Sequence, residues 1–238
     1  MENHITATCP NWLTARRTLG AVQSFKKFYP EVPLIIVDDH SNSKDKSTFD
    51  SIYSRPEYRP EVIYDPDNSK LRGIEGTTFI TARPHNTLGK GHGNAIDSAA
   101  DLARGGWLFH MDSDVRLVKG GLLEEMMKHA RPDVAAIGEL KVVNPKMPNL
   151  HNTFALYNLD LFFKMGVSFK PIIYNGRVRG YFPECEHPGQ ALEAGTEFCG
   201  MAHRIGYKLV NLPGIIGEYG HHLRYIGEDK DEVWQNYY

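Results

Sequence analysis

Hydrophobic residues in the first half of the chain form short continuous runs, separated by segments with helical spacing. Residues 5–9, in which two threonines alternate with apolar residues, are the first such segment; residues 34–37 are the second and are apolar throughout, and residues 107–111, which include His110, are the third. A continuous apolar run is typical of a strand buried on both faces, as in a parallel sheet. Between the first two runs, apolar residues recur every three or four positions from Trp12 to Val22, which predicts a helix.

The same patterns predict elements along the rest of the chain. We predict further strands at residues 62–64, 79–82, 134–137 and 207–212, and further helices at 89–103, 122–130, 150–165 and 196–205. The alternation of strands and helices predicts an α/β fold with a mostly parallel central sheet flanked by helices. Residues 168–188, rich in Gly, Pro and Tyr, are expected to form a long loop. Because no repeat or linker interrupts the chain, we expect one domain over residues 1–238.

Composition narrows the class of protein. The 27 basic and 29 acidic residues give a formal charge of -2, which disfavours a globally basic nucleic-acid binder. The three cysteines are an odd number and show no CxxC spacing, as is typical of reduced thiols in a cytosolic protein. We see no signal-peptide pattern and no run of about 20 apolar residues. A cytoplasmic location is therefore expected.

Asp112-Ser113-Asp114 directly follows the third apolar run. Alternate residues at the end of a strand can turn two carboxylates toward one point, and oxygen ligands suit Mg²⁺ or Mn²⁺. Such an ion can neutralise the two phosphates of a nucleotide diphosphate. The alternative is an Asx-type turn that leads into the next segment. The position of the motif after a buried strand favours the metal site.

Two other motifs carry polar groups suited to a nucleotide. Asp38 and Asp39 end the strand at 34–37, where a carboxylate can accept hydrogen bonds from a base or a ribose, or can simply terminate the strand. The loop Asn86-Thr-Leu-Gly-Lys-Gly-His-Gly-Asn94 contains glycines that allow close backbone approach, and Lys90 can pair with phosphate. Its spacing is not that of a P-loop.

Taken in order, these motifs resemble those of glycosyltransferase family 2, whose members have the Rossmann-like GT-A fold. The matching pieces are Thr6-Ala-Thr-Cys-Pro-Asn, Ile-Ile-Val-Asp-Asp-His-Ser, Asn-x-x-Gly-Lys-Gly-x-Gly-Asn and Met-Asp-Ser-Asp. The resemblance covers residues 4–140 well and 195–222 more loosely. It implies a metal-dependent hexosyltransferase with a DXD motif that takes a nucleotide-sugar donor, most often a UDP-sugar, with Mn²⁺ or Mg²⁺ as cofactor. Residues 1–140 would form the nucleotide-sugar half and 141–238 the acceptor half.

The resemblance also assigns roles to residues of the donor half. Asp38 or Asp39 would contact the base, and Thr8, which we place at the end of the first strand, would lie near the nucleoside. Lys90 would lie near the diphosphate. Asp112 and Ser113 would contribute to nucleotide binding, and Asp112 and Asp114 to metal binding.

Two further roles come from the second half of the chain. The family has a carboxylate at the start of a late helix that acts as the base of an inverting reaction. Glu197 is the candidate here and Glu193 the alternative, although Phe198 stands where the family motif has Asp; a helix-dipole role for Glu197 stays open. The family also supplies a histidine to the metal, for which we choose His222, with His221 as the alternative.

The acceptor is poorly specified by the sequence. The middle of the chain has a local basic bias, from Lys141, Lys146, Lys164, Lys170, Arg177 and Arg179. This bias fits a solvated surface, or else an anionic acceptor such as a phosphorylated saccharide, a lipid phosphate or modified DNA. Two rival functions are a sugar-1-phosphate nucleotidyltransferase and a non-catalytic nucleotide-sugar-binding module. The first needs a glycine-rich loop after the first strand, and no glycine precedes Gly20.

Overall fold

A computed structural model describes residues 4–41, 64–83, 91–103, 105–144, 147–169 and 194–222. Its centre is a seven-stranded sheet in the order β3-β2-β1-β4-β7-β6-β8. The strands are β1 (Ile5–Asn11), β2 (Leu34–Asp38), β3 (Thr77–Thr81), β4 (Trp107–Met111), β6 (Val134–Asn144), β7 (Met147–Asn158) and β8 (Lys208–Asn211). Only β7 runs against the others, since it pairs antiparallel with both β4 and β6 while the remaining pairs are parallel.

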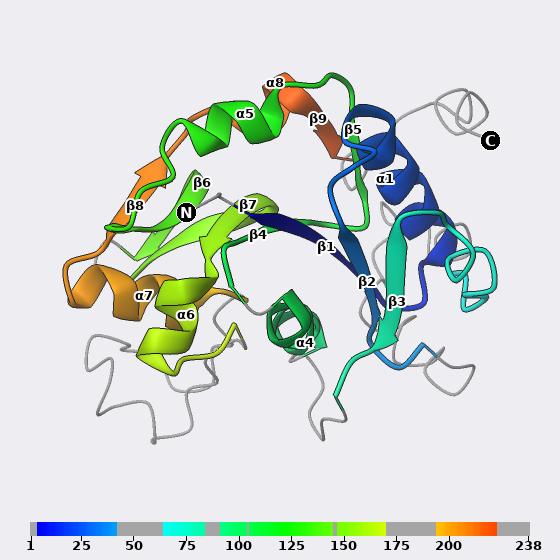
Figure 1. Cartoon of the computed structure of the whole chain (residues 1–238), viewed down its shortest axis with the longest axis horizontal. Helices are drawn as coiled ribbons and strands as arrows, with labels where there is room; N and C mark the ends of the chain where they lie inside the picture. Colours follow the sequence, from blue (N-terminus) through cyan, green and yellow to red (C-terminus); the bar gives the residue numbers. More distant parts are fainter. Residues whose placement is uncertain are drawn as a thin grey trace.

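Helices cover both faces of this sheet (Figure 1). On one face lie α1 (Ala15–Phe28), α5 (Leu122–Met127) and α8 (Ile215–Tyr219), whose buried side chains form one apolar cluster with the sheet. On the other face lie α4 (Gly91–Ala103), α6 (Leu159–Met165) and α7 (Thr196–Arg204), which belong to a second cluster. Two short strands, β5 (Val115–Leu117) and β9 (Gly220–His222), form a small antiparallel sheet. Their pairing brings the end of the described chain beside the segment that follows β4. The predicted α/β class with a mostly parallel sheet is confirmed.

Most of the predicted elements are confirmed, although α1 extends to Phe28 and β6 to Asn144, well beyond the predicted ends. The helix predicted at 150–165 is wrong in its first part, because residues up to Asn158 belong to β7 and only α6 is helical. The four residues 154–157 are all completely buried, as expected for a strand with partners on both sides. Pairing with β4 and β6 therefore overrides the helical spacing of Leu150, Phe154 and Tyr157. Asn158 then caps α6, its side chain accepting a hydrogen bond from the backbone N–H of Leu161 at 3.2 Å.

Several predictions fall on parts of the chain outside the described residues. These are the first two residues of the strand at 62–64 and most of the loop at 168–188. Of the cysteines, Cys9 and Cys199 are buried free thiols, while Cys185 lies outside. Within the described ranges, no helix has the length and apolarity needed to cross a bilayer.

Candidate functional site

Asp112, Asp114 and His222 meet beyond the carboxyl end of β4. One ligand atom from each lies within 4.8 Å of the other two. The histidine arrives through the small sheet, in which His222 is the register partner of Val115, and its Nε2 lies 3.5 Å from Oδ1 of Asp114. Neighbouring residues on a strand point to opposite sides, so His221 is exposed while His222 is half-buried. The structure therefore brings His222, and not His221, to the two carboxylates.

A second group of ligand atoms shares Asp112. Nε2 of His92, from the first turn of α4, lies 2.9 Å from Nε2 of His110, the fourth residue of β4. Both nitrogens are 3.5 Å from Oδ1 of Asp112. Neither histidine was predicted from the sequence. The signal for His110 was present, because residues two apart on a strand face the same side, and His110 is two before Asp112.

Hydrogen bonds hold the Asp112 carboxylate from the side of β7. The hydroxyl of Thr153 donates to Oδ2 of Asp112 at 3.4 Å, and the backbone N–H of Asp112 donates to the carbonyl of Thr153 at 3.4 Å. The same hydroxyl lies 2.8 Å from Nδ1 of His151, whose ring is edge-on to that of His222, with centroids 6.3 Å apart. Sequence reasoning also missed His151, because its place depends on β7 being a strand.

The charges in this region favour an ionised carboxylate. Burial by itself raises the pKa of Asp112, but the hydrogen bond with His110 and the electrostatic interactions with the three neighbouring histidines outweigh it, and hold that pKa well below its ordinary value. Burial lowers the pKa of His92, against the opposing pull of nearby Asp112 and of Asp114 and Asp39. The region thus combines an anionic oxygen ligand with a histidine that favours its neutral, metal-binding form.

The carboxyl ends of β1 and β2 are joined by a hydrogen-bonded network around Asn11. Its side-chain N–H groups donate to Oδ1 of Asp38 at 2.8 Å and to Oδ1 of Asn68 at 2.9 Å, and its own oxygen accepts from Thr18 at 2.7 Å. The other oxygen of Asp38 accepts the backbone N–H of Ser41 at 3.1 Å. Asp38 is therefore buried and engaged inside the protein at both oxygens.

No protein-family model matches the sequence, and no curated protein matches it. Over 89% of its length the chain superimposes on the mannosyltransferase PcManGT of Pyrobaculum calidifontis, solved in complex with GDP-Man and Mn²⁺, with a TM-score of 0.57 and 14% identity. This chain has a GT-A fold. It spans 55% of the length of that mannosyltransferase.

Two other solved structures with lower scores are similar to this GT-A chain. The galactosyltransferase LgtC, in complex with donor and acceptor sugar analogs, gives a TM-score of 0.48 at 12% identity and covers 88% of this chain and 73% of its own. A protein assigned as a glucose-1-phosphate thymidylyltransferase from Bacillus anthracis gives 0.45 at 11% identity, with coverages of 87% and 86%. The narrower assignment to glycosyltransferase family 2 stays a prediction.

The remaining predicted donor residues differ in how the GT-A sheet places them. The expectation that Thr8 ends the first strand is wrong, since β1 continues to Asn11 and Thr8 is completely buried. A completely buried hydroxyl cannot touch a nucleoside unless the surrounding side chains move. Asp39, directly after β2, is half-buried, as is Ser113. Lys90 lies outside the described residues.

Glu197 lies in the first turn of α7, at the same end of the sheet as Asp112. Since β7 runs antiparallel to β4 with Phe154 opposite Met111, its earlier residues extend past the carboxyl end of β4. One of them, Asn149, donates from its side chain to the carbonyl of Ala194 at 3.1 Å and so holds the start of α7 there. Glu193, the alternative base, lies outside the described residues, as do Lys146, Lys170, Arg177 and Arg179.

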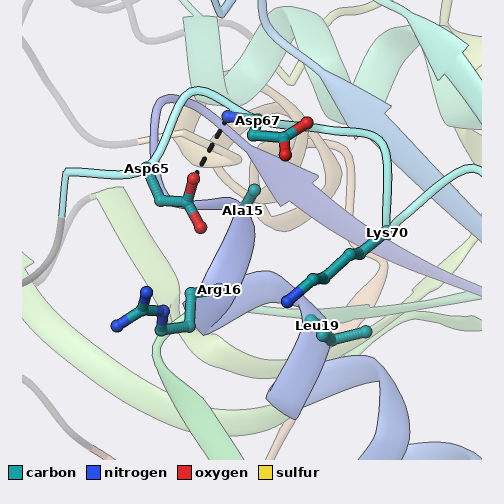
Figure 2. Close-up of a pocket in the computed structure, with 6 residues that line it drawn as sticks. All are labelled: Ala15, Arg16, Leu19, Asp65, Asp67 and Lys70. Atoms are coloured by element: carbon teal, nitrogen blue, oxygen red, sulfur yellow. Dashed lines mark hydrogen bonds between the residues drawn. The ribbon is translucent and has the colours of Figure 1, made fainter.

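A separate groove of about 480 Å³ lies beside the start of α1 (Figure 2). It is lined by Ala15, Arg16, Leu19, Asp65, Asp67 and Lys70. In Figure 2, Lys70 extends over Leu19 on one side, while Asp65 and Arg16 lie on the other. None of the strand-end carboxylates is among its lining residues, so this groove is distinct from the Asp112 cluster.

Proposed function

We propose that this chain is a metal-dependent glycosyltransferase, which transfers a hexose from a UDP-sugar to an acceptor hydroxyl with inversion at the anomeric carbon. The observation that carries this proposal is the convergence of Asp112, Asp114 and His222 at the carboxyl end of β4. In open α/β sheets, ligands bind beyond the carboxyl ends of the strands, which is where this cluster lies.

The residues of the cluster fit a divalent cation. Two carboxylates and one imidazole suit Mn²⁺, and the carboxylates also suit Mg²⁺. Asp112, Asp114 and His222 would hold the ion. When bound, it would offset the negative charge of the nucleotide diphosphate as the sugar leaves. Thr153 orients one oxygen of Asp112 by its hydrogen bond, so the carboxylate needs little rearrangement to bind.

Nucleoside recognition is assigned to the carboxyl end of β2. Both oxygens of Asp38 are engaged by Asn11 and Ser41, which makes Asp38 a support for this edge. Asp39 is the residue we propose to accept hydrogen bonds from the base or ribose, because it lies at the same edge and acts electrostatically on His92. Ser113, beside the metal ligands, and Lys90 would complete the contacts to the nucleotide.

Glu197 is the proposed general base, with Glu193 as the alternative. Its place in the first turn of α7, at the same end of the sheet as Asp112, supports this role. There it would take the proton of the acceptor hydroxyl as that oxygen attacks the anomeric carbon from the face opposite the leaving diphosphate. Under this proposal residues 1–140 bind the donor and 141–238 the acceptor, which would be an anionic saccharide or modified DNA.

The first test is a donor screen with the full chain. Thermal unfolding is measured with UDP-, GDP- and CMP-sugars, each with and without Mn²⁺. We expect a UDP-sugar to stabilise the protein only with Mn²⁺, by about 2.7 kcal/mol at a hundredfold excess over Kd, and Asp114→Asn to remove this effect. A larger shift with a GDP-sugar would overturn the choice of UDP, and no shift with any donor would overturn the proposal.

The second test separates an enzyme from a binding module. The chain is incubated with the stabilising donor and Mn²⁺ but no acceptor, and free sugar is measured over many hours. Slow hydrolysis that is lost in Asp114→Asn supports an enzyme, whereas binding without hydrolysis supports a non-catalytic module. The anomeric configuration of the released sugar, read by NMR at early times, tests the mechanism: retention would reject the role of Glu197.

A further inference from the structure

His92, His110 and Asp112 form a group of ligand atoms that the proposed donor site does not use in full. It brings together two imidazole nitrogens and one carboxylate oxygen, whereas the Asp112–Asp114–His222 group offers two carboxylates and one imidazole. Imidazole ligands favour Zn²⁺, Co²⁺ and Ni²⁺, while carboxylate ligands favour Mg²⁺ and Mn²⁺. The two groups therefore differ in the kind of ion that they suit.

The separations in this group match those of ligands around one ion. Atoms that share an ion at about 2.0–2.2 Å lie about 2.8–3.6 Å apart in octahedral or tetrahedral sites. The two Nε2 atoms are 2.9 Å apart, and each is 3.5 Å from Oδ1 of Asp112. The histidine rings meet edge-on, at an interplanar angle of 65° with centroids 4.9 Å apart, so that their Nε2 corners converge.

The polar contacts of His110 are directed at the other two ligands, His92 and Asp112. The ring is completely buried, and within the described residues its Nδ1 has no hydrogen-bond partner. Its contacts to His92 and Asp112 are both made through Nε2. A buried histidine normally satisfies its nitrogens, and here only the nitrogen that faces the group does so.

Two of the three ligands come from regular elements, and the group is partly exposed. His110 belongs to the central strand β4 and His92 to the first turn of α4, so both ligands are fixed by regular elements. The side chain of His92 is 37% exposed, while that of Asp112 is 17% exposed. Solvent can thus reach the group from the side of His92, although His110 is enclosed.

We propose that His92, His110 and Asp112 bind one ion of the Zn²⁺ class, in a site separate from the Mn²⁺ or Mg²⁺ site but sharing Asp112 with it. The three residues leave coordination positions open for water or another ligand. The proposal does not depend on sugar transfer, because it concerns only the affinity of the chain for the free metal.

The test is a metal titration of the full chain after treatment with a chelator. Zn²⁺ affinity is measured by competition with a chromophoric chelator, and Mn²⁺ affinity by the EPR signal of the free ion. We expect His92→Ala to weaken Zn²⁺ binding at least about tenfold and to leave Mn²⁺ binding within about threefold of the parent. Asp114→Ala should do the opposite. Co²⁺ absorption should show nitrogen ligation in the parent chain, and this absorption should weaken in His92→Ala.

Controls distinguish a lost ligand from a lost fold. His92→Gln keeps a side chain of similar reach, and the thermal unfolding of both His92 variants in chelator should match that of the parent. Should His92→Ala unfold, His92→Gln serves for the comparison. Equal Zn²⁺ affinity in the parent and the His92 variant would overturn the proposal. So would zinc binding that is lost in Asp114→Ala, since the ion would then occupy the oxygen-rich group.

Discussion

Nε2 of His222 lies 3.5 Å from Oδ1 of Asp114, although the two residues are far apart in the sequence. The pairing of β5 with β9 sets this distance, because His222 is in register with Val115, the residue after Asp114. The proposed metal site thus depends on a small sheet of two three-residue strands as well as on the end of β4.

The two adjacent histidines of β9 offer a matched pair of variants. His222→Ala should weaken Mn²⁺ binding at least about tenfold, because it removes one of three ligands. His221→Ala should leave it unchanged, because that side chain is exposed on the other side of the strand. Calorimetric titration with Mn²⁺ measures both. Equal losses in the two variants would mean that the strand β9, and not the imidazole of His222, determines the affinity for Mn²⁺.

Gly220 fixes how closely β9 approaches the core. A Cβ at this position would lie 2.6 Å from the ring of Phe154, which is completely buried and cannot move aside. Its backbone is extended, so Gly220→Ala should act through this clash alone. We expect β9 to shift and Mn²⁺ affinity to fall although no ligand is removed. In Gly217→Ala, where a Cβ meets open space, titration should give the parent affinity.

Asp38 and Asp39 should separate stability from nucleotide binding. Asp38→Asn places an N–H donor against Asn11 or the Ser41 N–H, so it should lower the free energy of unfolding by about 1–3 kcal/mol. Asp39→Asn should change the free energy of unfolding by no more than about 0.5 kcal/mol. It should weaken the binding of the nucleotide-sugar donor. Urea unfolding and nucleotide titration of both variants measure this. If Asp38→Asn kept the stability of the parent but bound the donor more weakly, Asp38 and not Asp39 would be the residue that contacts the nucleotide.

How much of the fold and of the candidate site could be predicted depends on whether local or long-range contacts determine each element. The ends of β2 and β4, which carry Asp38 and Asp112, follow from continuous apolar runs, since a local pattern marks a buried parallel strand. The strand β7 was misread because its apolar spacing also suits a helix, and only its partners decide. His92 and His151 were missed because each reaches the site from another element, whose packing the sequence does not specify. His110, in contrast, could have been found from its spacing to Asp112.

Gly20, a residue of α1, makes room for the buried side chain of Arg116 from β5. Replacing a helical glycine by alanine ordinarily stabilises a protein by about 0.5–1 kcal/mol. Here the Cβ would lie 2.6 Å from Nε of Arg116, which is only 3% exposed. Gly20→Ala should therefore lower the free energy of unfolding by about 1–3 kcal/mol. Urea unfolding would contradict this packing if Gly20→Ala and Gly217→Ala changed stability alike.

Tyr29 links the end of α1 to the start of α5. Its hydroxyl donates to Oε2 of Glu124 and accepts the backbone N–H of Leu123, both at 3.1 Å, and the side chain is buried. Burial raises the pKa of Tyr29 from 10.0 to about 12. Tyr29→Phe removes both hydrogen bonds and should cost about 1–2 kcal/mol at neutral pH.

The alkaline range tests the cause of that pKa. The neutral phenol is favoured in the folded state, so its stabilising effect is complete below pH 10, where the unfolded chain also keeps the proton. Between pH 10 and 12 the unfolded chain loses the proton first, and the parent should lose on the order of 2 kcal/mol relative to Tyr29→Phe. Urea unfolding of both proteins at pH 8, 9.5 and 11 measures the gap, since the other tyrosines titrate in both. A gap that stays constant over this range would show that Tyr29 ionises as freely in the folded protein as in the unfolded chain.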